Sequence, residues 1–327
     1  MRYEPYLGES RAWPQIGRRS NVIMSTIAFE LVPTSAGGSL PLAKREVQKV
    51  KAALQRNGLY DRINTFMLPH IISEDSDRPV PLDEKMDPLD FSRVITKERI
   101  DVDFILSQVT VFTTREDLEA RLKHIRSADI ERLVFVGIPR EIGGRAVVGP
   151  FPNEAMSLFR DLMPYRGAVL IPTRPDEETR LLQKLDAGAN FVLTQMLFSD
   201  QIVSFLKGLP ERQVSPEILL SFAYVPNVES RVGLLRWLIR DETSSLVNRE
   251  LEEIATLARV PFKEKKARLL DLYKRIVDGL AGSDAFRVGL HFECPYGVSE
   301  PALETFAAML EVWSPEQSAK ATAGKTG

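Results

Sequence analysis

DFILSQVTVFTTREDLEARLKHIRSADIERLVFVGIP covers residues 103–139 and joins two apolar runs through a charged segment. The runs at 103–112 and 132–139 are rich in Val, Ile, Leu and Phe, which favours buried strands. The segment at 115–127 has the 3.6-residue periodicity of an amphipathic helix. Near-continuous apolar strands that alternate with helices predict a parallel sheet covered by helices.

The same alternation recurs along the whole chain. Further strands are expected at 25–32, 63–70, 167–173, 190–198, 217–226 and 286–294. Further helices are expected at 42–57, 153–163, 177–187, 200–207 and 228–239, with two more in 251–281. Eight strand–helix units in a chain of 327 residues predict an α/β fold, a single-domain (βα)8 TIM barrel.

An open doubly wound sheet is the alternative fold. It is weakened because no G-x-G-x-x-G motif follows the first strand, and IGGRAVVG (142–149) lacks that spacing and suits a flexible loop. Two segments exceed a minimal barrel, namely 71–91 after the second strand and the helical stretch near 241–281. Neither has the character of a separate domain.

The bulk composition is that of a globular protein, with 44% hydrophobic and 27% charged residues. Because 43 Lys and Arg face 45 Asp and Glu, the net charge of −2 gives no argument for nucleic acid or an anionic membrane as a partner. The single cysteine, Cys294, excludes an intramolecular disulfide framework. One cysteine and three histidines also argue against a zinc cluster, so we expect no metal.

Residues 1–22 mix charge, Pro and Gly without the apolar core of a signal peptide. No run approaches the roughly 18 apolar residues of a membrane span. We expect 1–22 to be an N-terminal extension, 23–315 the barrel domain and 316–327 a disordered tail. Together with the cysteine content, these features predict a cytoplasmic protein, and they leave its oligomeric state open.

Polar side chains lie at the carboxyl ends of the expected strands, where a TIM barrel carries its active site. They are Glu30, His70, Gln108, Thr110, Arg140, Arg174, Gln195, Tyr224, His291 and Glu293. Each has a structural alternative: the two arginines suit solvated or ion-paired loops, and His70 suits a solvated loop. Gln195 lies in a buried run, so it would need internal hydrogen-bond partners if it points inward.

Glu30 is a candidate functional residue, because it is a carboxyl near the end of the apolar run STIAFELV, before Pro33. It is either a partly exposed strand end or a functional carboxyl. An unpaired ionised carboxylate is costly in an apolar site, so burial would raise its pKa. A pKa of roughly 6–7 would let it donate a proton near neutral pH.

Three segments resemble the methylenetetrahydrofolate reductase family. AFELVP (28–33) resembles its first-strand Phe-Glu-x-x-Pro segment, and LDAGANFVLTQMLFSD (185–200) is similar to its sixth strand. GLHFEC (289–294) is similar to its last strand, and order and spacing agree over roughly 24–315. The resemblance implies that Glu30 is the catalytic acid and that Gln195 contacts folate and nicotinamide.

The chain departs from the flavoenzymes of that family where they hold the flavin. Residues 135–138 replace a Leu-Arg-Gly-Asp segment, Gln108 replaces a histidine, and IPTRPDEE (171–178) replaces a Tyr-Pro-Glu-x-His-Pro region. The segments QVT, VGIPR, EILLSF, ESRVGL and YGVS are similar to a divergent mycobacterial branch, whose members use NADH without a flavin. This resemblance implies NADH as the co-substrate and argues against FAD.

The implied reaction reduces 5,10-methylenetetrahydrofolate to 5-methyltetrahydrofolate, a step of one-carbon metabolism and methionine biosynthesis. Protonation at N10 opens the five-membered ring to an N5 iminium cation, which then accepts a hydride. Without a flavin the hydride comes directly from NADH, so folate and NADH must be bound together. After losing its proton, Glu30 would stabilise the cation.

The remaining candidates are assigned binding roles. Gln195 suits the pterin edge or the nicotinamide amide, and Glu293 either accepts from pterin N–H groups or pairs with Arg140 or Arg174. Further candidates are Gln108, Thr110, Tyr224 and His291 for the substrate, Arg174 and Tyr296 for the cofactor, and Arg231, Lys274 and Arg275 for the glutamyl tail of folate. His291 is equally compatible with a satisfied interior histidine.

Three alternative functions stay open at this point: an FAD-dependent form of the same reaction, a folate-dependent methyltransferase and a folate-binding barrel without activity. A methyltransferase would need a corrinoid or a thiol acceptor, and no segment suggests a cobalamin site.

Overall fold

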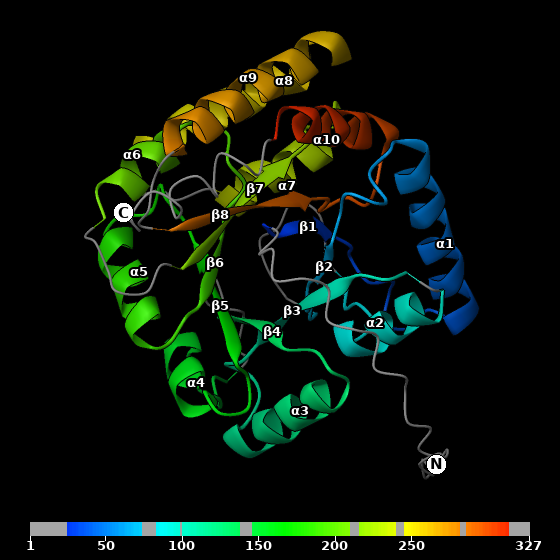
Figure 1. Ribbon diagram of the computed structural model, residues 1–327, viewed down its shortest axis with the longest axis vertical. Helices are drawn as coiled ribbons and strands as arrows, with labels where there is room; N and C mark the ends of the chain where they lie inside the picture. The colour runs from blue at the N-terminus through cyan, green and yellow to red at the C-terminus, as the bar shows by residue number, and fades with distance from the viewer. Residues whose placement is uncertain are drawn as a thin grey trace, which may run out of the picture.

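The computed structural model describes residues 25–73, 83–98, 100–137, 146–209, 216–239, 245–281 and 286–313. Its eight parallel strands form one closed barrel in the order β1 to β8, surrounded by helices (Figure 1). β1 pairs with β2 on one side and with β8 on the other. This closure confirms the predicted TIM barrel and excludes the open sheet. The predicted extension 1–22 and tail 316–327 lie outside the described residues.

The strands are β1 Ile27–Glu30, β2 Thr65–Leu68, β3 Asp103–Val109, β4 Arg132–Val136, β5 Tyr165–Leu170, β6 Phe191–Thr194, β7 Glu217–Ala223 and β8 Arg287–Glu293. The helices are α1 Leu40–Arg56, α2 Pro88–Lys97, α3 Arg115–Ser127, α4 Pro152–Leu158, α5 Glu177–Asp186, α6 Gln201–Lys207, α7 Glu229–Ile239, α8 Ser245–Arg259, α9 Phe262–Leu280 and α10 Glu300–Val312. Among these described helices, none combines the length and the apolar character that crossing a bilayer requires.

Two helices, α2 and α10, were not expected from the sequence. Both carry a Pro in the first turn, where its missing N–H is harmless to a helix, although the same residue at first sight marks a loop. The Asp87 carboxylate caps α2 by accepting hydrogen bonds from the backbone N–H groups of Leu89 and Asp90. The two helices predicted within 251–281 are present as α8 and α9, with α8 starting earlier, at Ser245.

The α7–α8 pair is an insertion in the barrel pattern. α9 packs between α6 and α10, the place of a seventh outer helix, whereas α7 and α8 pack against each other. The side-chain amide of Gln195, just after β6, donates to the carbonyl oxygen of Leu238 near the end of α7 at 3.2 Å. The pair therefore reaches the mouth of the barrel, where strands end and active sites of this fold lie.

Side chains alternate between the lumen and the helix layer. Met67, Ile105, Val134, Phe191 and Leu219 belong to one cluster inside the barrel, while their neighbours along each strand pack against the helices. Since parallel partners in register share a face, this cluster identifies the lumen side of every strand.

An ion pair lies inside the opposite, N-terminal end of the barrel. Arg132 donates to Glu217 at 2.8 Å and to the Thr26 hydroxyl at 2.9 Å, and its guanidinium stacks over the Phe191 ring at 4.7 Å. Glycines make room for this layer: a Cβ on Gly289 would come within 2.5 Å of Leu219, and one on Gly167 within 2.4 Å of the Phe191 ring.

We predict that Gly167→Ala destabilises the protein by about 1–3 kcal/mol, because the added methyl group overlaps the enclosed Phe191 ring. Gly37→Ala is the matched control, since a Cβ there meets nothing within 4 Å. Urea denaturation of both variants measures the effect. Equal free energies of unfolding for the two variants would contradict the packing described for the lumen.

Candidate active site

Two carboxyl groups lie side by side at the mouth of the barrel. Glu30 is the last residue of β1, Glu293 is the last residue of β8, and the register pairs Phe29 with Phe292. Glu293 shares its face with His291 and Ser221, and Glu30 shares its face with Ala28, all on the lumen side. Glu30 is 9% exposed, and the Glu293 side chain is 16% exposed.

Burial controls the charge of both carboxyls. It raises the pKa of Glu30 from 4.5 to about 7, against the opposing effect of the Cys294 backbone N–H, which donates to Glu30 Oε1 at 3.2 Å. The pKa of Glu293 is raised well above its usual value, first by burial and then by the charge of Glu30, while a hydrogen bond with Ser221 opposes the rise. Near neutral pH the pair therefore retains protons.

His291 continues this lumen network but does not form a nucleophile triad. Ser221 Oγ lies 2.9 Å from His291 Nδ1, and Glu293 Oε1 lies 3.5 Å from the same nitrogen. A triad needs the hydroxyl and the carboxylate on opposite ring nitrogens. Burial lowers the pKa of His291 to about 3, so the ring is neutral, and its Nε2 has no hydrogen-bond partner among the described residues.

A small cavity of about 20 Å³ lies beside Glu293, between the ends of β7 and β8. Tyr224, Arg231, Cys294 and Tyr296 are among the residues that line it. The Arg231 guanidinium lies 5.9 Å from the centre of the Tyr296 ring. Arg231 thus lies at the mouth and lines the same cavity as Glu293.

Tyr224 leaves β7 towards α9. Its ring lies 6.3 Å from the Phe262 ring and 5.0 Å from Lys265 Nζ. Lys265 is fully buried, donates to the Val225 carbonyl at 2.6 Å and to Asn227, and has its pKa lowered to about 8 by burial. Lys265 thus holds the loop after β7 in place, a role that its position in a charged helical segment does not reveal from the sequence.

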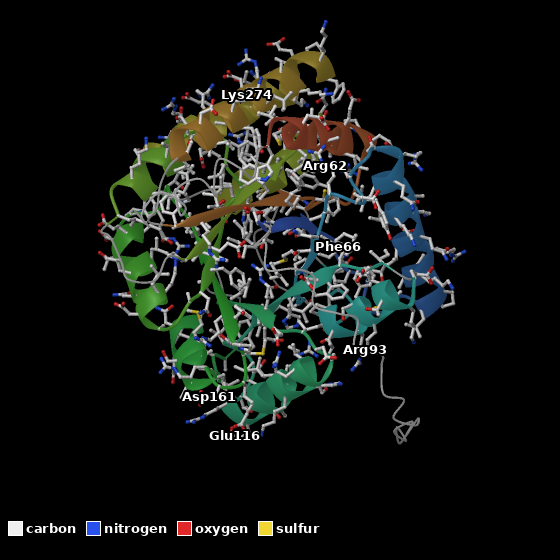
Figure 2. All side chains as sticks on the ribbon, in the orientation of Figure 1. Arg62, Phe66, Arg93, Glu116, Asp161 and Lys274 are labelled. Carbon is white, nitrogen blue, oxygen red and sulfur yellow. The ribbon has the colours of Figure 1, made fainter. Side chains whose placement is uncertain are left out.

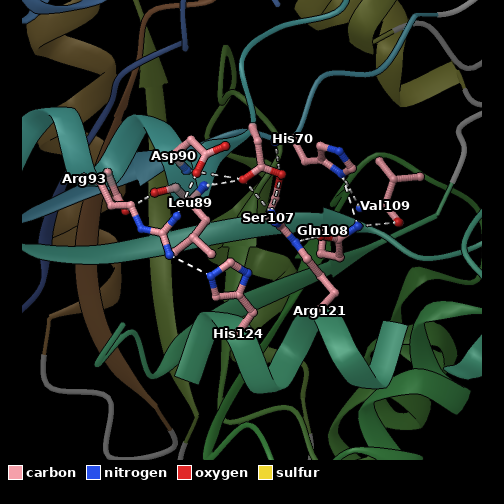
Figure 3. A network of polar contacts seen from close by, with 11 residues as sticks. His70, Leu89, Asp90, Arg93, Ser107, Gln108, Val109, Arg121 and His124 are labelled. Carbon is pink, nitrogen blue, oxygen red and sulfur yellow. Dashed lines mark hydrogen bonds and ion pairs between the residues drawn. The ribbon is translucent and has the colours of Figure 1, made fainter. Parts of the chain in front are cut away.

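Gln108 of β3 and Thr110, which follows that strand, face away from the lumen, so the structure does not bring them together with Glu30. Gln108 accepts from Arg121 of α3 at 3.3 Å and donates to the Val109 carbonyl at 2.8 Å (Figure 3). Thr110 is fully buried and donates to the Pro150 carbonyl at 2.7 Å. Strand alternation instead directs their neighbour Ser107 into the lumen.

His70 joins the same network. Its Nδ1 accepts from the Val109 backbone N–H at 3.2 Å and lies 3.3 Å from the Gln108 amide nitrogen. Arg121 continues the network to the Asp87 carboxylate, 2.6 Å away. The His70 backbone N–H donates to Ser107 Oγ at 2.7 Å, so the loop after β2 is fixed to β3.

The predicted cations are dispersed over the molecule. Arg174 lies 3.6 Å from the buried Glu177, so it pairs with this carboxylate and not with Glu293, for which it was one of the partners left open by the sequence. Arg275 pairs with Asp200 at 3.2 Å, and Lys274 is exposed on the outer side of α9 (Figure 2). These two cannot meet a ligand in the lumen, whereas Arg231 lies at the mouth.

Arg140 lies outside the described residues, so its predicted role is unaltered. Within the described ranges, no group of three or more His, Cys, Asp and Glu side chains is arranged to hold a metal ion.

The comparison with protein families shows to which family the chain belongs. A family model described as mycobacterial methylenetetrahydrofolate reductase matches residues 23–317, a range that includes all eight strands. The chain belongs to this family. The resemblance inferred from three short segments is thereby confirmed, and membership in a methylenetetrahydrofolate reductase family indicates a folate-related function and an oxidoreductase of that kind.

A solved structure supports the fold. An uncharacterized protein from Clostridium thermocellum, which binds two copies of 5-methyl-5,6,7,8-tetrahydrofolic acid, matches with a TM-score of 0.59 and 16% identity, over 88% of this chain and 94% of its own. EDTA monooxygenase (EmoA) from Chelativorans sp. BNC1 covers the same shares with a TM-score of 0.46 and 12% identity. A comparison with curated proteins finds no match.

For this member of the methylenetetrahydrofolate reductase family, we predict a stability that depends on Glu30. Because its pKa rises from 4.5 to about 7 on folding, the folded protein binds more protons than the unfolded chain between these values, and stability falls as pH rises through that window. Glu30→Gln removes this loss. Relative to the unmodified protein, the free energy of unfolding of Glu30→Gln should increase by up to about 3 kcal/mol between about pH 5 and pH 8.

Urea denaturation at both pH values measures this difference. Glu131→Gln is the matched control, because it makes the same chemical change on an exposed side chain just before β4, at the opposite end of the barrel. A Glu30→Gln advantage that is equal at the two pH values would show that burial does not penalise the Glu30 charge.

Proposed function

We propose that the protein is a cytoplasmic methylenetetrahydrofolate reductase that transfers a hydride from NADH directly to 5,10-methylenetetrahydrofolate. The observation that carries the proposal is the buried Glu30 at the mouth of the lumen, with its pKa raised to about 7. An acid with this pKa holds its proton at neutral pH and can still release it, which is the requirement for opening the folate ring.

Glu30 has two tasks in the proposed reaction. It donates its proton to N10 of the folate, which opens the five-membered ring, and the carboxylate that is left stabilises the cation at N5. The Cys294 backbone N–H lies 3.2 Å from Glu30 Oε1. It stabilises the carboxylate that remains after proton transfer, because a hydrogen bond to the charged form favours that form.

Glu293 and His291 contribute the polar wall of the site. A pterin ring carries guanidine-like N–H donors, and a carboxyl group such as Glu293 is their natural acceptor. His291 Nε2, buried and without a described partner, is a second polar atom that a ligand can satisfy. Gln195 offers its amide to the pterin edge or to the nicotinamide amide.

The chain's own residues support a flavin-free reaction. β4 ends in Val136, and Gly137 and Ile138 follow it; the flavoenzymes of the family carry an Arg and an Asp at the positions of Val136 and Ile138. These three residues have no charged or hydrogen-bonding side chain to offer a flavin. Gln108, at the position of a flavin-contacting histidine, faces the helix layer. We therefore assign no step to FAD.

The structural neighbour from Clostridium thermocellum binds 5-methyltetrahydrofolic acid, which is the product of the proposed reaction. At 16% identity it supports a folate ligand through the common barrel alone. The proposal rests chiefly on the family and on Glu30.

We predict that Glu30→Gln lowers kcat for NADH oxidation with methylenetetrahydrofolate by about 10²–10⁴-fold, because the amide cannot donate a titratable proton. Folate binding, measured by equilibrium titration, should change little. In the unmodified enzyme, kcat/KM should fall about tenfold per pH unit above about pH 7, as Glu30 ionises.

Glu131→Gln again serves as the control and should leave both quantities unchanged. If Glu30→Gln kept full activity, Glu30 would not be the acid. If neither protein oxidised NADH although both bound folate, the chain would be a folate-binding barrel without this activity.

We predict intersecting initial-velocity lines when NADH is varied at several folate concentrations, because both ligands must occupy the site together. Parallel lines would indicate that the substrates take turns at a flavin. An absorbance scan of the purified protein for flavin bands gives an independent reading, and bands in proportion to protein would overturn the flavin-free proposal.

A further inference from the structure

The turn that follows Gln195 is held by a buried carboxyl from the α7–α8 pair. Ser199 Oγ donates to Glu250 Oε1 of α8 at 2.9 Å. The backbone N–H groups of Phe198 and Ser199 donate to the same carboxyl. Ser199 and Glu250 are each only 4% exposed, so these bonds are sheltered from water.

Burial of a carboxyl costs desolvation free energy, so its presence in place of an apolar side chain needs an explanation. Burial raises the pKa of Glu250 to about 7, and no Lys or Arg contributes to that shift, so hydrogen bonds from the turn satisfy this group. Leu or Met at this place would pack without that cost. Its three acceptor contacts all go to one turn, residues 198–199, which connects β6 to α6.

The α7–α8 pair also contacts Gln195 itself. The Leu238 carbonyl of α7 accepts from one N–H of the Gln195 amide at 3.2 Å. The Gln195 backbone N–H donates to the Leu170 carbonyl at 2.6 Å, and that of Leu197 donates to the Ser221 carbonyl at 2.9 Å. The backbone of the segment is thus held from β5 and β7, and its outer side from the inserted helices.

We propose that Glu250 is a positioning residue for Gln195: it fixes the turn at 198–199 so that the Gln195 side chain, held by α7, presents its carbonyl oxygen and second N–H to the ligands. This inference rests on the proposed function, in which Gln195 binds folate and NADH. It also gives the inserted α7–α8 pair a role, because one helix holds the side chain and the other holds the backbone that follows it.

A double-mutant cycle tests the proposal. Glu250→Ala should raise KM for folate and for NADH about tenfold and change kcat much less, since Glu250 does not touch the reacting atoms. Gln195→Ala should raise both KM values by at least as much. Combined with Gln195→Ala, Glu250→Ala should have no further effect, because its consequence passes through the missing amide.

Several variants separate positioning from general damage. Glu252→Ala, on the exposed face of the same helix, should leave KM unchanged. Glu250→Gln, which keeps one acceptor oxygen, should recover most of the affinity. If Glu250→Ala does not fold, Glu250→Asp, which withdraws the carboxyl by one methylene, replaces it in the cycle.

The outcomes distinguish the two proposals. Multiplying effects in the double variant, or unchanged KM values in Glu250→Ala, would overturn the positioning role alone. Unchanged KM values in Gln195→Ala would overturn both this inference and the binding role of Gln195. If the enzyme shows no turnover, the same cycle is read from Kd for 5-methyltetrahydrofolate, where additive losses would again overturn the inference.

Discussion

The pairing of β8 with β1 is the constraint on which the site depends. It closes the barrel and joins residues that are far apart in the chain, such as Cys294 and Glu30. The seam is packed from outside by aromatic rings, with Phe292 stacked on Phe306 of α10 at 4.6 Å and Phe29 edge-on to the same ring at 6.4 Å. A slip of one residue in this register would turn a carboxyl out of the lumen.

The two ends of the lumen differ in how their buried carboxyl groups are stabilised. At the N-terminal end, Glu217 pairs with Arg132, and the layer is closed by side chains. At the mouth, Glu30 and Glu293 lie together with a neutral His291, and burial makes them retain protons. One end therefore stabilises the barrel, while the other keeps a pair of carboxyls whose burial costs stability, an arrangement common at functional sites.

The inserted helices α7 and α8 support the mouth of the barrel and not its outer layer. α9 completes the outer layer next to α6 and α10. The α7 and α8 helices are therefore not needed in that layer and instead contact the mouth of the barrel. Their contacts reach the segment after β6 through the Leu238 carbonyl and the Glu250 carboxyl. A barrel can gain such an insertion without strain because the loops after its strands tolerate length, whereas the strands do not.

The sequence alone determined the barrel, since eight apolar runs alternating with amphipathic segments leave few other architectures, and it placed Glu30 at a strand end. It missed α2 and α10, whose early prolines resemble loop residues. Only the tertiary structure decided which polar residues enter the lumen: Ser107, Ser221 and Glu293 do, while Gln108 and Thr110 do not. The physical reason is that a strand buried on both faces has no polar alternation to reveal its inner side, which is set by pairing with distant strands.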